Sequence, residues 1–274
     1  MANSKQNTQL LASLKKHFGY DSFREGQQET IQSLLDGHST LSIFPTGAGK
    51  SLCYQLTALL LKGKTSIVIS PLLSLIRDQI QQLDKLEISS TSLNSSQTSE
   101  EQNRAIEQLE SGSISILFLS PESLLKKDYQ PLLKSLSVGL IAVDEAHCVS
   151  EWGNSFRPSY LLAAGAIRKL KPHAILALTA TATKDVARDI RSRFKIKTKD
   201  QFQTPLYREN LQYLIHPCLA EQRDSELAQL LKNGANLPAI VYVMKQIDAE
   251  SVCGFLQKNG IKARAYHAGM NPEA

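Results

Sequence analysis

Five short apolar segments, separated by longer stretches of mixed polarity, constrain the fold of this chain more than any other feature. The segments are 39–44, 65–70, 113–120, 138–144 and 174–179. They are almost continuously apolar, whereas a strand with one face in water alternates apolar and polar residues. Such segments are typical of parallel strands that helices cover on both faces. The sequence therefore predicts an α/β fold with a mostly parallel sheet covered by helices.

Amphipathic helix candidates lie between these segments, as right-handed crossover connections require. The candidates are 51–62, 73–86, 99–111 and 158–170. In the third, Ser99 and Gln102 have the spacing of a capping box, which predicts a helix start there.

A polar segment with weak periodicity at 198–215 predicts a boundary between two domains, 1–205 and 206–274. Beyond it the pattern of strands and helices begins again. The candidates there are helices at 222–232 and 247–259 and strands at 238–244 and 262–269. We expect a second α/β unit, of which this chain contains only the beginning.

Charge and cysteine usage restrict the partners and the compartment. The chain has 31 Lys and Arg against 26 Asp and Glu, a formal net charge of +5, which permits a polyanionic partner without requiring one. The four cysteines have no zinc-ribbon spacing. No apolar segment is long enough to span a bilayer. The sequence predicts a cytoplasmic protein with no membrane contact, associated with the nucleoid if bacterial.

The strongest chemical signal follows the first apolar segment, where 45–51 reads PTGAGKS. Gly47 and Gly49 allow a tight turn that aims backbone N–H groups at phosphate oxygens. Lys50 is then placed to reach the β- and γ-phosphates, and Ser51 to bind Mg²⁺. We interpret this segment as a nucleotide phosphate loop.

The phosphate loop departs from the general pattern at one position. Phe44 stands where that pattern has its first glycine. The resulting form, PTGxGKS, is the one seen in helicases. The alternative is a glycine-rich turn before an ordinary core helix. The succession of strand, GKS and helix favours nucleotide binding.

Two adjacent carboxylates, Asp144 and Glu145, follow the apolar segment 138–144. Open α/β sheets bind ligands at the carboxyl ends of their strands. Asp144 is predicted to hold Mg²⁺, partly through water, and Glu145 to act as general base toward the attacking water. A helix N-cap with a solvated acid is the alternative.

Together with other short segments in the same order, these two motifs resemble the RecQ family of superfamily-2 DNA helicases. The further segments are FGYDSFREGQQETI (18–31), SPLLSLIRDQIQQL (70–83), LNSSQTSEE (93–101), LSPESL (119–124), DEAHCVSEWGNSFRPSY (144–160) and LTATAT (178–183). The resemblance covers nearly the whole chain. It implies a RecA-like P-loop domain followed by the beginning of a second RecA-like domain, with ATP and Mg²⁺ as cofactors.

The resemblance also assigns roles to single residues. It places ATP at Arg24, Gln27, Thr46, Gly47, Ala48, Gly49, Lys50 and Ser51, with the adenine edge at Gln27. It implies that the catalytic residues are Lys50, Asp144, Glu145 and His147. Thr179 and Thr181 are expected to couple the two α/β units. The alternative for these threonines is a strand end followed by an ordinary helix start.

The DNA-binding residues implied by the resemblance are Ser70, Pro71, Trp152, Phe156, Arg157 and His267. Trp152 is the only tryptophan, and its turn-forming neighbours indicate an exposed loop in which rings can stack on unpaired bases. The alternative is that Trp152 and Phe156 fold onto the surface of the domain as a local cap and do not bind bases. The loop differs from the commonest family form at Glu151, Asn154 and Ser155.

The expected activity is ATP-driven 3′-to-5′ translocation on single-stranded DNA with unwinding of partially duplex DNA. The resemblance implies that the arginine-finger segment lies beyond this chain, so we expect ATP–Mg²⁺ binding with slow turnover. The alternatives are an RNA-remodelling ATPase, a non-enzymatic nucleic-acid-binding fragment and a metabolic P-loop kinase.

Overall fold

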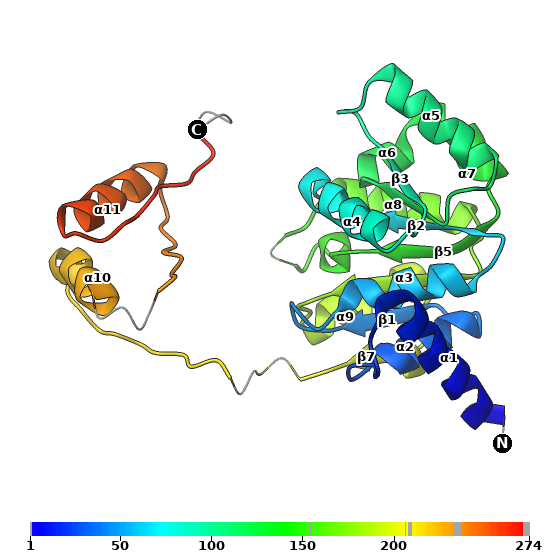
Figure 1. Ribbon diagram of the computed structural model, residues 1–274, viewed down its shortest axis with the longest axis horizontal. Coiled ribbons are helices and arrows are strands. Elements are labelled where there is room, and N and C mark those ends of the chain that lie inside the picture. Colours follow the sequence, from blue (N-terminus) through cyan, green and yellow to red (C-terminus); the bar gives the residue numbers. More distant parts are fainter. Residues whose placement is uncertain (1, 154, 206, 208–209, 233–236, 271–274) are drawn as a thin grey trace. The chain divides into compact units, whose positions relative to one another are not determined.

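The structure is a computed structural model that describes residues 2–153, 155–205, 207, 210–232 and 237–270. The chain forms two compact units, Met1–Arg208 and Glu209–Ala274, which we describe separately (Figure 1). The assignment of 1–205 and 206–274 to two helicase domains stays a prediction.

The described part of the first unit is built around a seven-stranded sheet in the order β3-β4-β2-β5-β6-β1-β7. The strands are β1 Thr40–Ile43, β2 Thr65–Ile69, β3 Ser90–Leu93, β4 Ile116–Leu119, β5 Val138–Val143, β6 Ala174–Thr179 and β7 Gln201–Gln203. Every pair of neighbours is parallel. The predicted RecA-like α/β fold is confirmed.

The sequence predicts the five central strands and misses the two edge strands. Each central strand is buried along its whole length, because it has a neighbour on both sides and helices on both faces. At the edges, β3 (STSL) and β7 (QFQ) carry polar residues and are only partly buried. They lack the continuous apolar character by which the central strands are found.

Two layers of helices cover the sheet, and residues alternate between them along each strand. In β5, Leu140 and Ala142 face one layer while Ile141 and Val143 face the other. The first layer contains α1 Ala2–Phe18, α2 Gln27–Leu35, α3 Lys50–Leu60 and α4 Leu73–Lys85. The second contains α5 Ser99–Glu110, α6 Pro121–Leu125, α7 Gln130–Ser135, α8 Pro158–Lys169 and α9 Lys184–Phe194.

The four helices predicted for this unit are confirmed as α3, α4, α5 and α8. The predicted capping box is wrong by one residue, because α5 takes Thr98 as its N-cap rather than Ser99. Thr98 Oγ1 accepts from the Glu101 N–H at 3.2 Å, and Glu101 Oε2 accepts from the Thr98 N–H at 2.8 Å. Glutamate therefore closes the box in place of Gln102.

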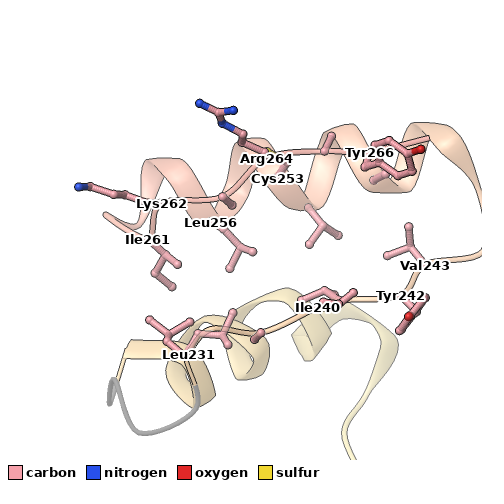
Figure 2. A pocket seen from close by; sticks show the side chains of 17 residues that line it. Leu231, Ile240, Tyr242, Val243, Cys253, Leu256, Ile261, Lys262, Arg264 and Tyr266 are labelled. Carbon is pink, nitrogen blue, oxygen red and sulfur yellow. The ribbon is translucent and has the colours of Figure 1, made fainter. Parts of the chain in front are cut away.

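The second unit contains the two predicted helices, α10 Arg223–Lys232 and α11 Gln246–Lys258. The strands predicted at 238–244 and 262–269 are wrong, because the described residues there form no strand. Their side chains line an apolar pocket of about 550 Å³ beside the two helices (Figure 2). In the described chain, no helix combines the length and apolar character needed to cross a bilayer.

Candidate nucleotide site and neighbouring loop

The strand order brings the predicted motifs together at the carboxyl ends of the central strands. β6 lies between β5 and β1, with Val143 opposite Ala177 and Ile43 opposite Thr179. The segments that follow β1, β5 and β6 therefore leave the sheet side by side. The N–H of Phe44 donates to the Thr179 carbonyl at 3.1 Å, which joins two of these strand ends. This edge is where open α/β sheets bind ligands.

The phosphate loop, residues 45–51, has the backbone form that its glycines permit. Gly47 and Gly49 have φ values of 81° and 76°, in the left-handed region. α3 begins at Lys50 with Gly49 as its N-cap and without a side-chain cap. The N–H of Leu52 donates to the Gly49 carbonyl at 3.2 Å, no side chain caps the start of the helix, and the helix dipole favours an anion there.

Arg24 and Gln27 hold the phosphate loop from the side of α2. The Gln27 side chain, 2% exposed, donates through Nε2 to the carbonyls of Ala48 at 3.1 Å and Gly49 at 3.0 Å. Its Oε1 accepts from the Arg24 N–H, and the Arg24 guanidinium donates to the Gly47 carbonyl. Both residues thus contact the loop backbone, while the adenine role of Gln27 stays a prediction.

Lys50 lies in the first turn of α3, and its Nζ donates to the Phe44 carbonyl at 3.2 Å. Its positive charge also lowers the pKa of both Asp144 and Glu145. The charge effect agrees with the strand pairing, which places the segments after β1 and β5 side by side. Ser51 follows Lys50 in the same turn of α3, as a metal ligand beside a phosphate-binding lysine must.

The pKa values of the two acids, Asp144 and Glu145, are shifted in opposite directions. Burial raises the pKa of Asp144 to about 6, and the neighbouring charge of Glu145 adds to this effect. A hydrogen bond from His147 lowers the pKa of Glu145, so this carboxylate is ionised at neutral pH. Glu145 also has a left-handed backbone, with φ of 49° and ψ of 44°. Such a conformation in a residue other than glycine is held by its surroundings.

His147 joins the acid pair to the end of β6. Its Nδ1 lies 3.2 Å from Glu145 Oε2 and 2.9 Å from Thr179 Oγ1. Hydrogen bonds with the side chains of Cys148 and Glu145 raise the pKa of His147 to about 9. Thr179 is fully buried and donates to the Thr181 carbonyl at 2.9 Å. Thr179 thus belongs to the site, Thr181 is attached through its backbone, and coupling to the second unit stays a prediction.

Replacing His147 by glutamine is expected to cost more unfolding free energy near pH 6 than near pH 9.5. The pKa of about 9 in the folded protein lies above the ordinary value of 6.5. The stabilisation is therefore complete below pH 6.5 and is lost as the pH rises through 9, a difference of at most about 3 kcal/mol. Urea denaturation of both proteins across this range measures it. His17→Gln is the control and should show no such dependence on pH. If His147→Gln costs the same unfolding free energy at both pH values, the pairing of His147 with Glu145 is contradicted.

The loop that carries Trp152, residues 150–153 and 155–157, is called here the Trp152 loop. Trp152 is 77% exposed, and Phe156 is half-buried. Arg157 donates from a guanidinium nitrogen to the Pro71 carbonyl at 3.4 Å, so the loop contacts the segment after β2. Neighbouring Ser70 is 4% exposed, with its hydroxyl buried and unpaired among the described residues. Five of the six predicted DNA-binding residues thus lie in this loop or in the segment after β2 that it contacts.

His267, the remaining predicted DNA-binding residue, belongs to the second unit. Its Nε2 lies 3.2 Å from Glu250 Oε1 of α11. Its DNA-binding role stays a prediction. Asn154, one of the positions at which the loop departs from the family form, lies outside the described residues.

Tyr160 is a site residue to which the sequence assigns no role, although it ends the family segment 144–160. It lies in the first turn of α8, is 1% exposed, and donates from its hydroxyl to the Asp144 carbonyl at 3.0 Å. Neither that segment nor the spacing of sixteen positions indicates which atoms touch, so only the folded structure shows the contact.

The residues at this edge fit a magnesium ion that is bound together with a nucleotide. A carboxylate and a hydroxyl, from Asp144 and Ser51, are the hard oxygen ligands that Mg²⁺ prefers. In the described part of the chain, no cluster of three or more His, Cys, Asp or Glu side chains is arranged to hold a metal. Mg²⁺ commonly keeps one or two protein ligands and takes the others from phosphate and water.

Comparison with known proteins agrees with this geometry. The profile of the family "DEAD/DEAH box helicase" matches residues 24–190. The chain is 37% identical over 94% of its length to the ATP-dependent DNA helicase RecQ of Bacillus subtilis, covering 43% of that protein. It is 39% identical over 95% of its length to RecQ of Haemophilus influenzae, covering 42%. The match to ATP-dependent DNA helicase Q-like 5 of Arabidopsis thaliana is 41% over 92%, covering 28%.

Solved structures show the same fold at low sequence identity. The helicase MrfA bound to DNA has a TM-score of 0.70 and 18% identity, covering 96% of this chain and 41% of that one. The Mycobacterium smegmatis helicase Lhr, bound to ssDNA and AMP-PNP, has a TM-score of 0.66 and 20% identity, covering 93% and 37%. The chain thus spans less than half the length of each of these relatives.

Proposed function

The chain belongs to the DEAD/DEAH box helicase family, and from this we propose that it binds ATP with Mg²⁺ and hydrolyses the bond between the β- and γ-phosphates, giving ADP and phosphate, as part of a RecQ-type DNA helicase. The observation that carries the proposal is that β1 and β5, the strands before the phosphate loop and the acid pair, both pair in parallel with β6, so that the two motifs leave the sheet side by side. The similarity to RecQ helicases over more than nine-tenths of the chain supports the same conclusion.

Each residue of the site has a distinct task in this proposal. The N–H groups at the start of α3 and the Lys50 ammonium bind the phosphates and leave the γ-phosphate facing the acids. Asp144 and Ser51 would hold Mg²⁺, which when bound neutralises phosphate charge. Glu145 accepts a proton from the attacking water at its carboxylate, which is ionised because its pKa is lowered. His147 keeps that carboxylate oriented through the contact at 3.2 Å.

We further propose that the DNA is a single strand along which the complete protein moves in the 3′-to-5′ direction, separating the duplex ahead. Three relatives are named as DNA helicases, and one structural neighbour is bound to DNA. Trp152 supports a single-stranded partner because an exposed ring stacks on bases that are not paired.

The proposal is tested by comparing stimulation of ATP hydrolysis by single-stranded DNA and by RNA of the same sequence. A DNA helicase is stimulated more strongly by DNA. Stronger stimulation by RNA would favour an RNA-remodelling ATPase. Retention of DNA without any nucleotide binding would favour a non-enzymatic nucleic-acid-binding protein.

Replacing Trp152 by alanine is expected to raise the concentration of single-stranded DNA that half-stimulates hydrolysis. Stacking of one base on an aromatic ring contributes about 1–3 kcal/mol, which corresponds to roughly 5- to 150-fold. Titration of the ATPase rate with an oligonucleotide measures the change. Leu162→Ala is the control, since Leu162 is also exposed, at 64%, and lies on α8. Equal DNA dependence of Trp152→Ala and wild type would assign Trp152 to a local surface cap.

A further inference from the structure

The Trp152 loop packs directly on the turn that follows the acid pair. The Arg157 N–H donates to the Cys148 carbonyl at 3.0 Å, which closes the loop at its far end. At the near end, a Cβ on Gly153 would lie 3.0 Å from the His147 carbonyl oxygen, closer than ordinary contacts. A shift of the backbone at Gly153 or Arg157 would therefore press on or pull the 3₁₀ turn Ala146–Val149.

α8 starts where this loop ends, and its first turn returns to the acid pair. Pro158 opens the helix, and the Tyr160 N–H donates to the Arg157 carbonyl at 3.0 Å. The ring of Tyr160 is buried, and its hydroxyl donates to the Asp144 carbonyl at 3.0 Å. Burial raises the pKa of this phenol, so the hydroxyl keeps the proton that it donates.

The carbonyl that Tyr160 contacts belongs to the peptide unit between Asp144 and Glu145. A peptide unit is planar, so its carbonyl and its N–H turn together. The N–H of this same unit, on Glu145, donates to Asp144 Oδ1 at 3.0 Å. Tyr160 thus holds one side of the peptide whose other side orients the carboxylate of Asp144. The bond that follows this peptide, N–Cα of Glu145, has the left-handed φ of 49°.

We propose that Tyr160 is a positioning residue of the nucleotide site, whose hydroxyl fixes the Asp144–Glu145 peptide and links it to the Trp152 loop. The inference rests on the proposed function, because Asp144 needs this orientation in order to bind Mg²⁺ with ATP. A change in the loop moves the start of α8, the hydroxyl of Tyr160 and then the peptide. The same link carries a change at the metal site back to the loop.

Replacement of Tyr160 by phenylalanine tests the link, because it removes the hydroxyl and leaves the ring in the core. The first readout is the Mg²⁺ concentration that half-saturates binding of a fluorescent ATP analogue. We expect it to rise at least about tenfold, as for groups that orient metal ligands. The second readout is the emission of Trp152, the only tryptophan, on addition of Mg²⁺ and ATP. We expect the wild-type emission change to be lost in Tyr160→Phe.

Tyr129→Phe is the matched control. Tyr129 is also buried, at 4% exposed, and its hydroxyl donates to Gln102 Oε1 at 3.3 Å. It should behave like wild type in both readouts. If Tyr160→Phe does not fold, Gly153→Ala tests the link from the loop side, since its Cβ presses on the His147 carbonyl. It should shift the Mg²⁺ dependence in the same direction.

The outcomes separate this inference from the proposed function. If wild type binds the ATP analogue and either readout of Tyr160→Phe equals the wild-type value, the inference is overturned and the proposed function stands. A wild-type protein that binds Mg²⁺ and ATP with no change in Trp152 emission also overturns the inference. If wild type binds no nucleotide, the proposed function fails, and the positioning role fails with it.

Discussion

Replacing Lys50 by alanine is expected to lower the affinity for ATP by at least about 100-fold. The ammonium group would make charge-assisted hydrogen bonds to the phosphates, each contributing about 1.5–3 kcal/mol. Two such bonds correspond to roughly 100-fold or more in affinity. Loss of the cation also removes a charge that lowers the pKa of Asp144 and Glu145. Calorimetric titration with Mg²⁺ and ATP measures the change.

Lys62→Ala provides the matched control for Lys50→Ala. Lys62 is exposed and follows the C-terminal end of α3, whereas Lys50 begins the same helix. Its replacement removes an equal charge away from the phosphate loop and should leave the ATP affinity unchanged. If Lys50→Ala folds like wild type and binds ATP with the same affinity, residues 45–51 are not the phosphate site.

Replacing Glu145 by glutamine is expected to slow hydrolysis about 10²- to 10⁴-fold, the usual contribution of a general base. The amide has the size of the carboxylate but cannot accept the proton of the attacking water. Nucleotide binding should persist, because Lys50 and the start of α3 are unchanged. Single-turnover hydrolysis, with protein in excess over ATP, resolves even slow rates and separates them from binding.

The control for Glu145→Gln is Glu110→Gln, at the exposed C-terminal end of α5. It should hydrolyse ATP at the wild-type rate. A Glu145→Gln protein that hydrolyses ATP within about threefold of wild type would assign proton acceptance to another group. A protein that fails to bind ATP would instead assign Glu145 to binding.

The parts of this fold that can be read from the sequence are those fixed by local chemistry. Central strands such as β5 are continuously apolar because they are buried on both faces, and no distant partner is needed to recognise them. The phosphate loop is recognisable because Gly47 and Gly49 must adopt left-handed conformations beside Lys50. The acid pair is recognisable because charge directly after a buried strand is costly unless it faces a ligand.

The contacts that complete the site depend on pairs of residues far apart in the chain. Gln27 reaches the carbonyl of Ala48, and His147 reaches the hydroxyl of Thr179, through folding alone. Tyr160, in the first turn of α8, reaches the carbonyl of Asp144 directly after β5. Neither spacing nor periodicity encodes these contacts, so the sequence places the residues in motifs but does not show which atoms touch.

The second unit shows how local pattern can mislead. The segment 238–244 has the apolar, β-branched composition of a strand, yet Ile240 and Tyr242 are 80% and 89% exposed. A strand of a parallel sheet requires a hydrogen-bonded neighbour, and composition does not supply one. The helices α10 and α11 are found correctly because their hydrogen bonds are internal to each segment.

The proposed function requires that the phosphate loop and the acid pair share one metal–nucleotide complex, and Mn²⁺ electron paramagnetic resonance measures this directly. Mn²⁺, used in place of Mg²⁺, should bind tightly to the wild-type protein only when ATP is present. Ser51→Ala and Asp144→Asn, one from each segment, should both weaken the binding of Mn²⁺ and ATP. If either of these variants, folded like wild type, binds the complex as tightly as wild type, the two segments do not hold one metal ion, and the central claim is wrong.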